Sequence, residues 1–372
     1  MQGELFFRNL INLINVSLPL QPEKPLKPHY NPPTPRMPEQ HRYNKRFRYF
    51  INYFLGPLLF IWLSYSIFIQ IRRQPGLEQS WAHIKETFES NRIWLLLAVM
   101  LLMVVNWSIE TVKWKLAVQW VQRIDFSTAL KAVMSGVSFS VMTPNRVGEY
   151  LGRVLYMDEG KRLKAISLTI TGSISQLIIT LFMGFISLLV LKQRIIASGM
   201  ISSFWMKMII YGVLTILVIL TLFYFRLAVL VRWIDRLPVM KKYTWLLDSL
   251  EGFNATLLLQ LLSLSAGRFL VFIIQYYLLF RLFDVDVSWW QGCWAVCLSF
   301  LVMAVIPTIA LITDLGLRGK VSLQLIGLFS NNQLGISLTA LSIWFINLII
   351  PAVVGSLLIL GIRKIFKNKT EQ

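Results

Sequence analysis

A short run between Thr143 and Arg153 gathers residue types that hold an anionic group. It reads Thr-Pro-Asn-Arg-Val-Gly-Glu-Tyr-Leu-Gly-Arg. Pro144 suits the first position of a helix and Thr143 can cap it, so we expect a helix N-terminus whose free N–H groups attract phosphate or carboxylate. Arg146 adds a planar donor suited to phosphate, and Glu149 precedes Arg153 at the spacing of a helical ion pair. The alternative is a tight exposed turn whose charges are solvated.

A second run, residues 307–319, offers similar groups. Asp314, or the threonine before it, could cap a helix that begins near Leu315 and so provide a second positive helix end. Arg318 would then correspond to Arg146. An ordinary exposed loop is the alternative.

Arg268 is the third candidate, because it lies near the middle of the apolar run 257–282. A charged residue at the centre of a bilayer costs about 2.5–3.5 kcal/mol on insertion scales, so it should face a cavity or a partner. We expect that partner to be Glu149, Asp314 or a lipid phosphate. The alternative is a shifted helix from which the arginine reaches the membrane surface. Glu110, near the end of another apolar run, is a weaker candidate, because a glutamate at a helix end is usually solvated.

Nothing in the sequence has the spacing of a catalytic, cofactor or metal site. The three histidines, His29, His41 and His83, lie in the N-terminal tail or in a loop. Cys293 and Cys297 are four residues apart in an apolar run, and two thiols without further ligands do not form a structural zinc site. Nucleotide-binding loops, nucleophile elbows and metal-binding helix motifs do not occur. We therefore expect no enzyme activity, no cofactor and no metal.

The elements that position these residues are predicted to be membrane helices. Hydrophobic residues make up 56% of the 372, and only 15% are charged, against about 25% in a soluble domain. The apolar residues form runs that reach the roughly 20 residues a helix needs to cross a bilayer. We predict an all-α polytopic membrane protein with about six full transmembrane helices, at 49–71, 93–112, 165–191, 205–225, 257–282 and 334–362.

The distribution of positive charge predicts the orientation. The formal net charge is +19, and most basic residues fall on one side of the membrane if the six spans alternate. Under the positive-inside rule that side is the cytoplasm, which places both termini there and suits a bacterial cytoplasmic (inner) membrane. Because no basic helix stands apart from the spans, we expect contact with membrane lipids and not with nucleic acid.

Two apolar stretches, 127–143 and 290–306, do not fit as ordinary spans. Each is followed by a proline, Pro144 or Pro307. We interpret them as the first arms of two re-entrant, broken-helix elements that enter from opposite sides, the arrangement of an inverted-repeat transporter. The alternative is that 290–312 crosses the membrane and the topology differs by one span.

The N-terminal segment differs from the rest of the chain. Residues 19–38 contain eight prolines, which excludes a helix or a packed core. We predict a disordered, Pro-rich cytoplasmic tail at 1–44 and a helical transmembrane domain at 45–372. Met37 precedes a basic stretch and the first span, so translation could begin at either Met1 or Met37.

The Pro-Asn-Arg-Val-Gly-Glu-Tyr-Leu-Gly-Arg run, with the span that follows it, resembles the lysylphosphatidylglycerol synthase transmembrane, or flippase-like, family over roughly residues 49–362. The 307–319 run matches that family's second motif, a proline followed by a Gly-rich turn and an acidic residue, more loosely. The chain ends soon after its last span, so we expect it to lack the soluble aminoacyl-transferase domain of bifunctional relatives. From the motifs and the resemblance we assign substrate binding to Thr143, Pro144, Asn145, Arg146, Gly148, Glu149, Arg153, Arg268, Asp314, Gly316 and Arg318.

The resemblance implies a lipid translocator that moves an anionic, aminoacylated or lipid-linked substrate between leaflets. Since no ATPase motif occurs, movement would be downhill or driven by an ion gradient. One alternative is a membrane enzyme that modifies lipid head groups with Glu149 or Asp314 as acid or base. Another is a non-catalytic membrane partner of an envelope enzyme. A homo-oligomer and an envelope-enzyme partner are both open options.

Overall fold

The computed structural model describes residues 92–143, 147–226, 255–306 and 311–367, and its regular structure within these ranges is helical throughout. The chain divides into two compact units, Leu59–Ile359 and Met1–Leu58 with Leu360–Gln372. The helices and the site described below belong to the first unit, except for the end of the last helix. The predicted tail 1–44 and first span 49–71 lie outside the described residues.

The order of the helices follows the predicted alternation of spans and shorter apolar segments. The bounds are α5 Ile93–Val118, α6 Phe126–Met142, α7 Gly148–Val154, α8 Arg162–Ala197, α9 Ser203–Phe225, α12 Ala255–Leu282, α13 Trp289–Val305, α14 Leu311–Ile326, α15 Gln333–Trp344, the π-helix η4 Phe345–Ile349 and α16 Ile350–Lys367.

Five segments in the described part of the chain are long and apolar enough to cross a membrane: α5, α8, α9, α12 and the continuous stretch Gln333–Ile359. They coincide with five of the six predicted spans, which confirms an all-α polytopic membrane protein. The largest difference is at α8, which has 36 residues. At 1.5 Å per residue it is about 54 Å long, well beyond a hydrocarbon core of about 30 Å, so its ends project into the interfaces.

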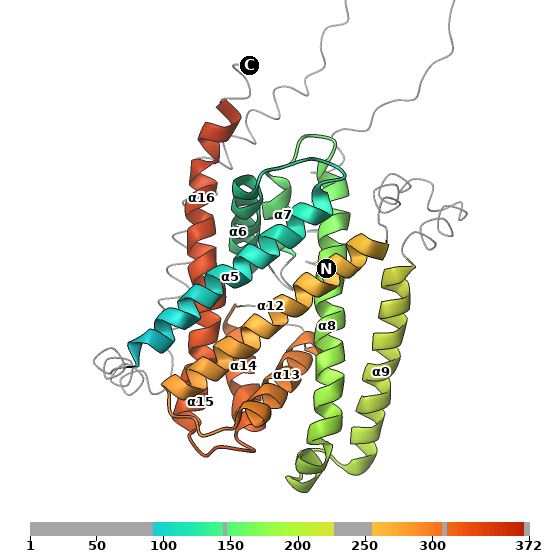
Figure 1. The fold of residues 1–372 in the computed structure, drawn as a ribbon, viewed down its shortest axis with the longest axis vertical. Helices are drawn as coiled ribbons and strands as arrows, with labels where there is room; N and C mark the ends of the chain where they lie inside the picture. Colours follow the sequence, from blue (N-terminus) through green and yellow to red (C-terminus); the bar gives the residue numbers. More distant parts are fainter. Residues whose placement is uncertain (1–91, 144–146, 227–254, 307–310, 368–372) are drawn as a thin grey trace, which may run out of the picture. The chain divides into compact units, whose positions relative to one another are not determined.

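α5 and α12 pack side by side in opposite directions (Figure 1). The antiparallel register follows from two interactions at separate levels. Arg92, before α5, pairs with Asp284, after α12, at 2.5 Å, and the Gln275 side chain donates to the Val99 carbonyl at 3.0 Å. This register decides which polar side chains of the two helices meet between these levels.

Each of these two helices leads into a pair of shorter helices. α6 packs against α7, and α13 against α14. Figure 1 places the α6–α7 pair toward one end of the Leu59–Ile359 unit and the α13–α14 pair toward the other. The same order, a long helix followed by two short helices and another long helix, therefore occurs twice in opposite directions, as the predicted inverted repeat requires. That the short pairs enter the bilayer without crossing it stays a prediction.

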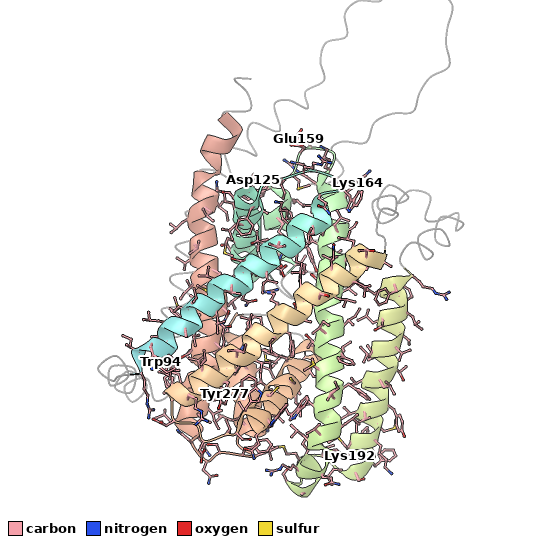
Figure 2. The ribbon with its side chains drawn as sticks, in the orientation of Figure 1. Trp94, Asp125, Glu159, Lys164, Lys192 and Tyr277 are labelled. Carbon is pink, nitrogen blue, oxygen red and sulfur yellow. The ribbon has the colours of Figure 1, made fainter. Side chains whose placement is uncertain are left out.

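α8 runs from one polar end of this unit to the other. Asp125, Glu159 and Lys164 lie at one end and Lys192 at the other (Figure 2). Asp125 caps α6, because its carboxylate accepts the Thr128 N–H at 3.1 Å, and hydrogen bonds with the Thr128 side chain and backbone lower the pKa of Asp125. Charged loops at two ends of an apolar body are the pattern that a bilayer selects.

The last span contains a π-helical turn, η4, immediately before α16. Pro351 explains its position. Proline has no N–H to donate and its ring clashes with the carbonyl four residues earlier, here that of Asn347. The helix widens over Phe345–Ile349 to accommodate this, and such π-turns recur at functional sites.

Two glycines allow α6 and α7 to touch backbone to backbone. A Cβ placed on Gly152 would lie 2.5 Å from the α-carbon of Gly136, and one on Gly148 would clash with the Phe139 carbonyl oxygen. Gly148 and Gly152 therefore allow the backbone of α6 to approach α7 closely.

We expect Gly152→Ala to destabilise the protein, because the added methyl group meets backbone that has no room to move. Overpacking of this kind costs about 1–3 kcal/mol. The measurement is the melting temperature of the purified protein in detergent. Gly212→Ala on α9 is the matched control, since a Cβ there has no heavy atom within 4 Å. Equal melting temperatures for the two variants would contradict the close packing of α6 and α7.

Candidate functional site

One buried carboxylate, that of Glu110 on α5, binds three cations from three helices. Its Oε2 atom lies 2.8 Å from Nζ of Lys113 and 2.7 Å from Nη1 of Arg268, and its Oε1 atom lies 2.8 Å from Nη2 of Arg153. Glu110 is 4% exposed and Lys113 and Arg153 are no more exposed than that. α5, α7 and α12 are thus joined at one point.

Neighbouring polar groups extend this cluster in two directions. Arg153 also pairs with Glu149 on its own helix. Arg268 donates from Nε to Oδ1 of Asn106 at 2.7 Å, and Nδ2 of Asn106 donates to Oδ1 of Asn347 in η4 at 3.2 Å. The network therefore runs from α7 through α5 and α12 to the π-turn of the last span.

The spacing along α5 accounts for its share of the network. Asn106, Glu110 and Lys113 are four and three residues apart, so they lie on one face of the helix. That face meets α12 at Arg268, whose guanidinium lies over the Trp107 ring at 5.0 Å from its centroid. Isolated charges are costly at membrane depth, but here each one has an opposite charge within contact distance.

α14 carries a second acid–arginine pair. Nη2 of Arg318 lies 3.5 Å from Oδ2 of Asp314, and the two residues are 9% and 8% exposed. α14 begins at Leu311, so the predicted start near Leu315 is wrong, and Asp314 lies in the first turn instead of at the cap. The predicted capping role of Asp314 is therefore replaced by an ion pair one turn along the helix.

The two pairs occupy equivalent places in the repeat. Glu149 and Arg153 lie on the second helix of one short pair, and Asp314 and Arg318 on the second helix of the other, both at i,i+4 spacing. Arg153 is thus a counterpart of Arg318 in this arrangement, while Arg146, which the sequence suggested, lies outside the described residues. The surroundings of Arg153 and Arg318 differ, because Arg153 contacts a second carboxylate, that of Glu110.

A cavity of about 660 Å³ lies beside both pairs. Its wall includes Glu110, Lys113, Glu149, Arg268, Asp314 and Arg318. Together with Arg153 behind Glu149, the described residues here supply four cations against three carboxylates. The same wall contains Trp107 and Trp344, whose indole nitrogens are buried without a hydrogen-bond partner among the described residues. Excess positive charge and unpaired donors suit an anionic ligand.

The remainder of the wall is apolar. Leu177 on α8, Phe272 on α12 and Phe300 and Met303 on α13 contribute to it. A ligand that fills the cavity would thus meet charged groups on one part of its surface and aromatic and aliphatic groups on another.

Four of the predicted site residues line this cavity: Glu149, Arg268, Asp314 and Arg318. Arg153 does not line the cavity, but its ion-pair partners Glu110 and Glu149 do. Pro144, Asn145 and Arg146 lie outside the described residues. Gly316 is exposed and has open space beside its α-carbon, so it is not part of the wall.

Thr143 and Gly148 lie at the α6–α7 junction. The Gly148 N–H donates to Oγ1 of Thr143 at 2.6 Å. α7 begins at Gly148, and Thr143 follows the last residue of α6. The predicted helix start at Pro144 lies outside the described residues. Thr143 still provides a hydroxyl to the first N–H of α7, which joins the two short helices.

The partner predicted for Arg268 is also corrected. Among the described carboxylates it pairs with Glu110, and not with Glu149 or Asp314. Sequence reasoning placed the end of the α5 span at residue 112 and took Glu110 as solvated, whereas α5 continues to Val118 and buries it. Lys113 and Asn106 were missed or given little weight, although their i,i+3 and i,i+4 spacing to Glu110 was visible in the sequence.

Gln176 and Asn347 make hydrogen bonds between helices, to the Ser265 carbonyl at 3.5 Å and with Asn106. Cys297 is fully buried in the core, as a small packing residue would be. Across the ranges that the structure describes, no group of three or more His, Cys, Asp and Glu side chains could hold a metal ion.

The family model described as the lysylphosphatidylglycerol synthase TM region matches residues 53–355. A comparison with curated proteins finds no match.

We expect Arg153→Met to lower the melting temperature strongly, because it leaves the Glu110 and Glu149 carboxylates close together without the cation between them. Breaking a buried ion pair costs about 3–5 kcal/mol. Lys161→Met is the control, since Lys161 forms a pair with Asp158 in which both side chains are more than 40% exposed. Such exposed pairs contribute about 0–1 kcal/mol. Similar melting temperatures for the two variants would refute the buried cluster.

Proposed function

Since the chain belongs to the lysylphosphatidylglycerol synthase transmembrane-region family, we propose that it is a lipid translocator, which moves lipids with an anionic, aminoacylated or lipid-linked head group between leaflets. The observation that carries the proposal is the cavity of about 660 Å³, whose surroundings hold four cations and three carboxylates. A head group enters such a cavity, while acyl chains stay against lipid.

The charges around the cavity support an anionic group as the part that is recognised. Arg268 and Arg318 both reach the wall, and guanidinium groups match the geometry of phosphate oxygens. Leu177, Phe272 and Phe300 give the same cavity an apolar side. A phospholipid has both kinds of surface, whereas a free inorganic anion has only one.

The pairing of the carboxylates favours transport over head-group chemistry. Glu110, Glu149 and Asp314 are the acidic residues in the described wall, and each contacts an arginine or lysine. A carboxylate whose oxygens are bound by cations has fewer lone pairs free to accept a proton from a substrate. We therefore propose that the chain is not an enzyme, and that membrane lipids are its main partners.

The proposal includes a location. The five candidate spans make the chain a multi-pass membrane protein. The excess of Lys and Arg on one side of the predicted spans supports a bacterial cytoplasmic (inner) membrane with both termini in the cytoplasm. The α6–α7 pair would then lie on the cytoplasmic side and the α13–α14 pair on the outer side.

Purified protein reconstituted in vesicles should accelerate leaflet exchange of tail-labelled fluorescent phospholipids, measured by the loss of fluorescence to a membrane-impermeant reductant. Arg318→Gln should slow exchange of anionic phospholipids about 10- to 100-fold, because one charge-assisted hydrogen bond contributes about 1.5–3 kcal/mol. Lys320→Gln on the same helix is exposed and should exchange at the wild-type rate.

Mass spectrometry of the same vesicles should recover every probe lipid unaltered, whereas a head-group enzyme would leave a product of changed mass. Wild-type protein that speeds the exchange of no tested phospholipid would overturn the proposal and favour a non-catalytic membrane partner.

Single cysteines at the two ends of the unit should report opposite sides of the membrane. In a background with Cys293 and Cys297 replaced by serine, Glu159→Cys should react with an impermeant maleimide only after the cytoplasmic membrane is opened. Ser202→Cys, between α8 and α9, should react in intact spheroplasts. Both positions are exposed. The reverse pattern would invert the proposed orientation.

A further inference from the structure

Two donor atoms of Arg268 are bound by side chains of the protein itself. Its Nη1 and Nε atoms donate to Glu110 and Asn106, both at 2.7 Å, and its flat face lies over Trp107. A guanidinium holds a carboxylate through the same planar edge that it uses for phosphate. Glu110 therefore occupies one of the donor atoms, Nη1, that Arg268 would offer to a lipid phosphate.

Charge explains why such an occupant is useful. Lys113, Arg153 and Arg268 carry three positive charges within 3 Å of one carboxylate. Without Glu110 these cations would face Glu149 alone, at membrane depth where attraction between charges is strong. A phosphate bound there would be held tightly, whereas conduction through a site requires binding weak enough for release.

Resting on the proposed function, we propose that Glu110 is a built-in competitor for the lipid's phosphate. It holds Arg268 while the cavity is empty, gives up part of that contact when an anionic head group enters, and recovers it when the head group leaves. Its role is to keep affinity low, and thus to keep exchange fast.

The two sides of the repeat agree with this role. Arg318, the counterpart of Arg153, has one carboxylate at 3.5 Å, whereas Arg153 has two, and the Nε atom of each arginine is buried without a hydrogen-bond partner in the described part of the chain. Among the described residues, Arg318 has no second carboxylate that corresponds to Glu110. An entering phosphate thus meets an arginine on α14 with one long ion pair and an arginine on α12 whose Nη1 atom is already bound at 2.7 Å.

The test is binding of a short-chain phosphatidic acid to the full chain in phosphatidylcholine nanodiscs, with short-chain diacylglycerol as the phosphate-free reference. Glu110→Gln should bind phosphatidic acid about 10- to 100-fold more tightly, the range of one or two charge-assisted hydrogen bonds, and should exchange anionic lipid more slowly. Tighter binding with slower exchange is a combination that a purely structural role for Glu110 does not produce.

Two variants distinguish competition by Glu110 for Arg268 from the general electrostatic effect of a negative charge in the cavity wall. Glu149→Gln removes the same charge from the same wall but leaves the partners of Arg268 in place, so its gain in affinity should be much smaller. Glu110→Asp keeps the charge but shortens the side chain by one methylene, so it should also bind phosphatidic acid more tightly than the wild type. Glu110→Asp decides the case if Glu110→Gln does not fold.

Equal gains for Glu149→Gln and Glu110→Gln would overturn the proposal, as would unchanged or weaker binding by both Glu110 variants. Failure of both variants to fold would make Glu110 a structural counter-ion and overturn it as well. If the wild type prefers phosphatidic acid over diacylglycerol in these cases, the proposed function still stands. If neither the wild type nor any variant shows that preference, recognition of an anionic head group fails too.

Discussion

The arrangement of the helices around the cavity depends on one shared carboxylate, that of Glu110, which Lys113, Arg153 and Arg268 all contact. Each cation alone would be costly at membrane depth, and a carboxylate alone would be equally so. Because the three cations come from α5, α7 and α12, they can share this carboxylate only if these helices meet with the observed register. The antiparallel α5–α12 pair and the glycine contact between α6 and α7 are the packing that makes this meeting fit.

The two short helix pairs share a pattern but differ in charge. Both carry an acid and an arginine at i,i+4 on their second helix. The preceding long helix differs, because α5 brings the carboxylate of Glu110 to Arg153, whereas among the described residues the carboxylate on Arg318 is that of Asp314 on its own helix. Two identical halves would hold an anion equally on both sides. The different surroundings of the two arginines give the two halves different affinity for an anion.

The sequence predicted the transmembrane helices better than the side-chain contacts between them, because the first depend on local pattern and the second on how helices pack. The length of an apolar run predicts a span, since the bilayer fixes how many residues a helix needs, and five of the six spans were recovered in this way. Prolines and helical spacing likewise predicted the two broken segments and the Glu149–Arg153 pair. The partner of Arg268 could not be predicted, because it depends on the register between α5 and α12, which no local spacing encodes. The error at Glu110 came from a span end placed at residue 112, six residues before α5 ends.

The weakest part of the polar network is the link from the charged cluster to the last span. Arg268 is bound to Glu110 by a charge-assisted hydrogen bond, and such bonds contribute about 1.5–3 kcal/mol. The step from Asn106 to Asn347 is a bond between two neutral amides at 3.2 Å, for which about 1 kcal/mol is typical. Movement of Arg268 would therefore break the hydrogen bond between Asn106 and Asn347 before it breaks the ion pairs. Asn347 lies in the π-turn that Pro351 creates, where the backbone ladder is already irregular. Beyond this turn the last span is held to α6 instead, because the Ser138 hydroxyl donates to the Ala352 carbonyl at 2.5 Å.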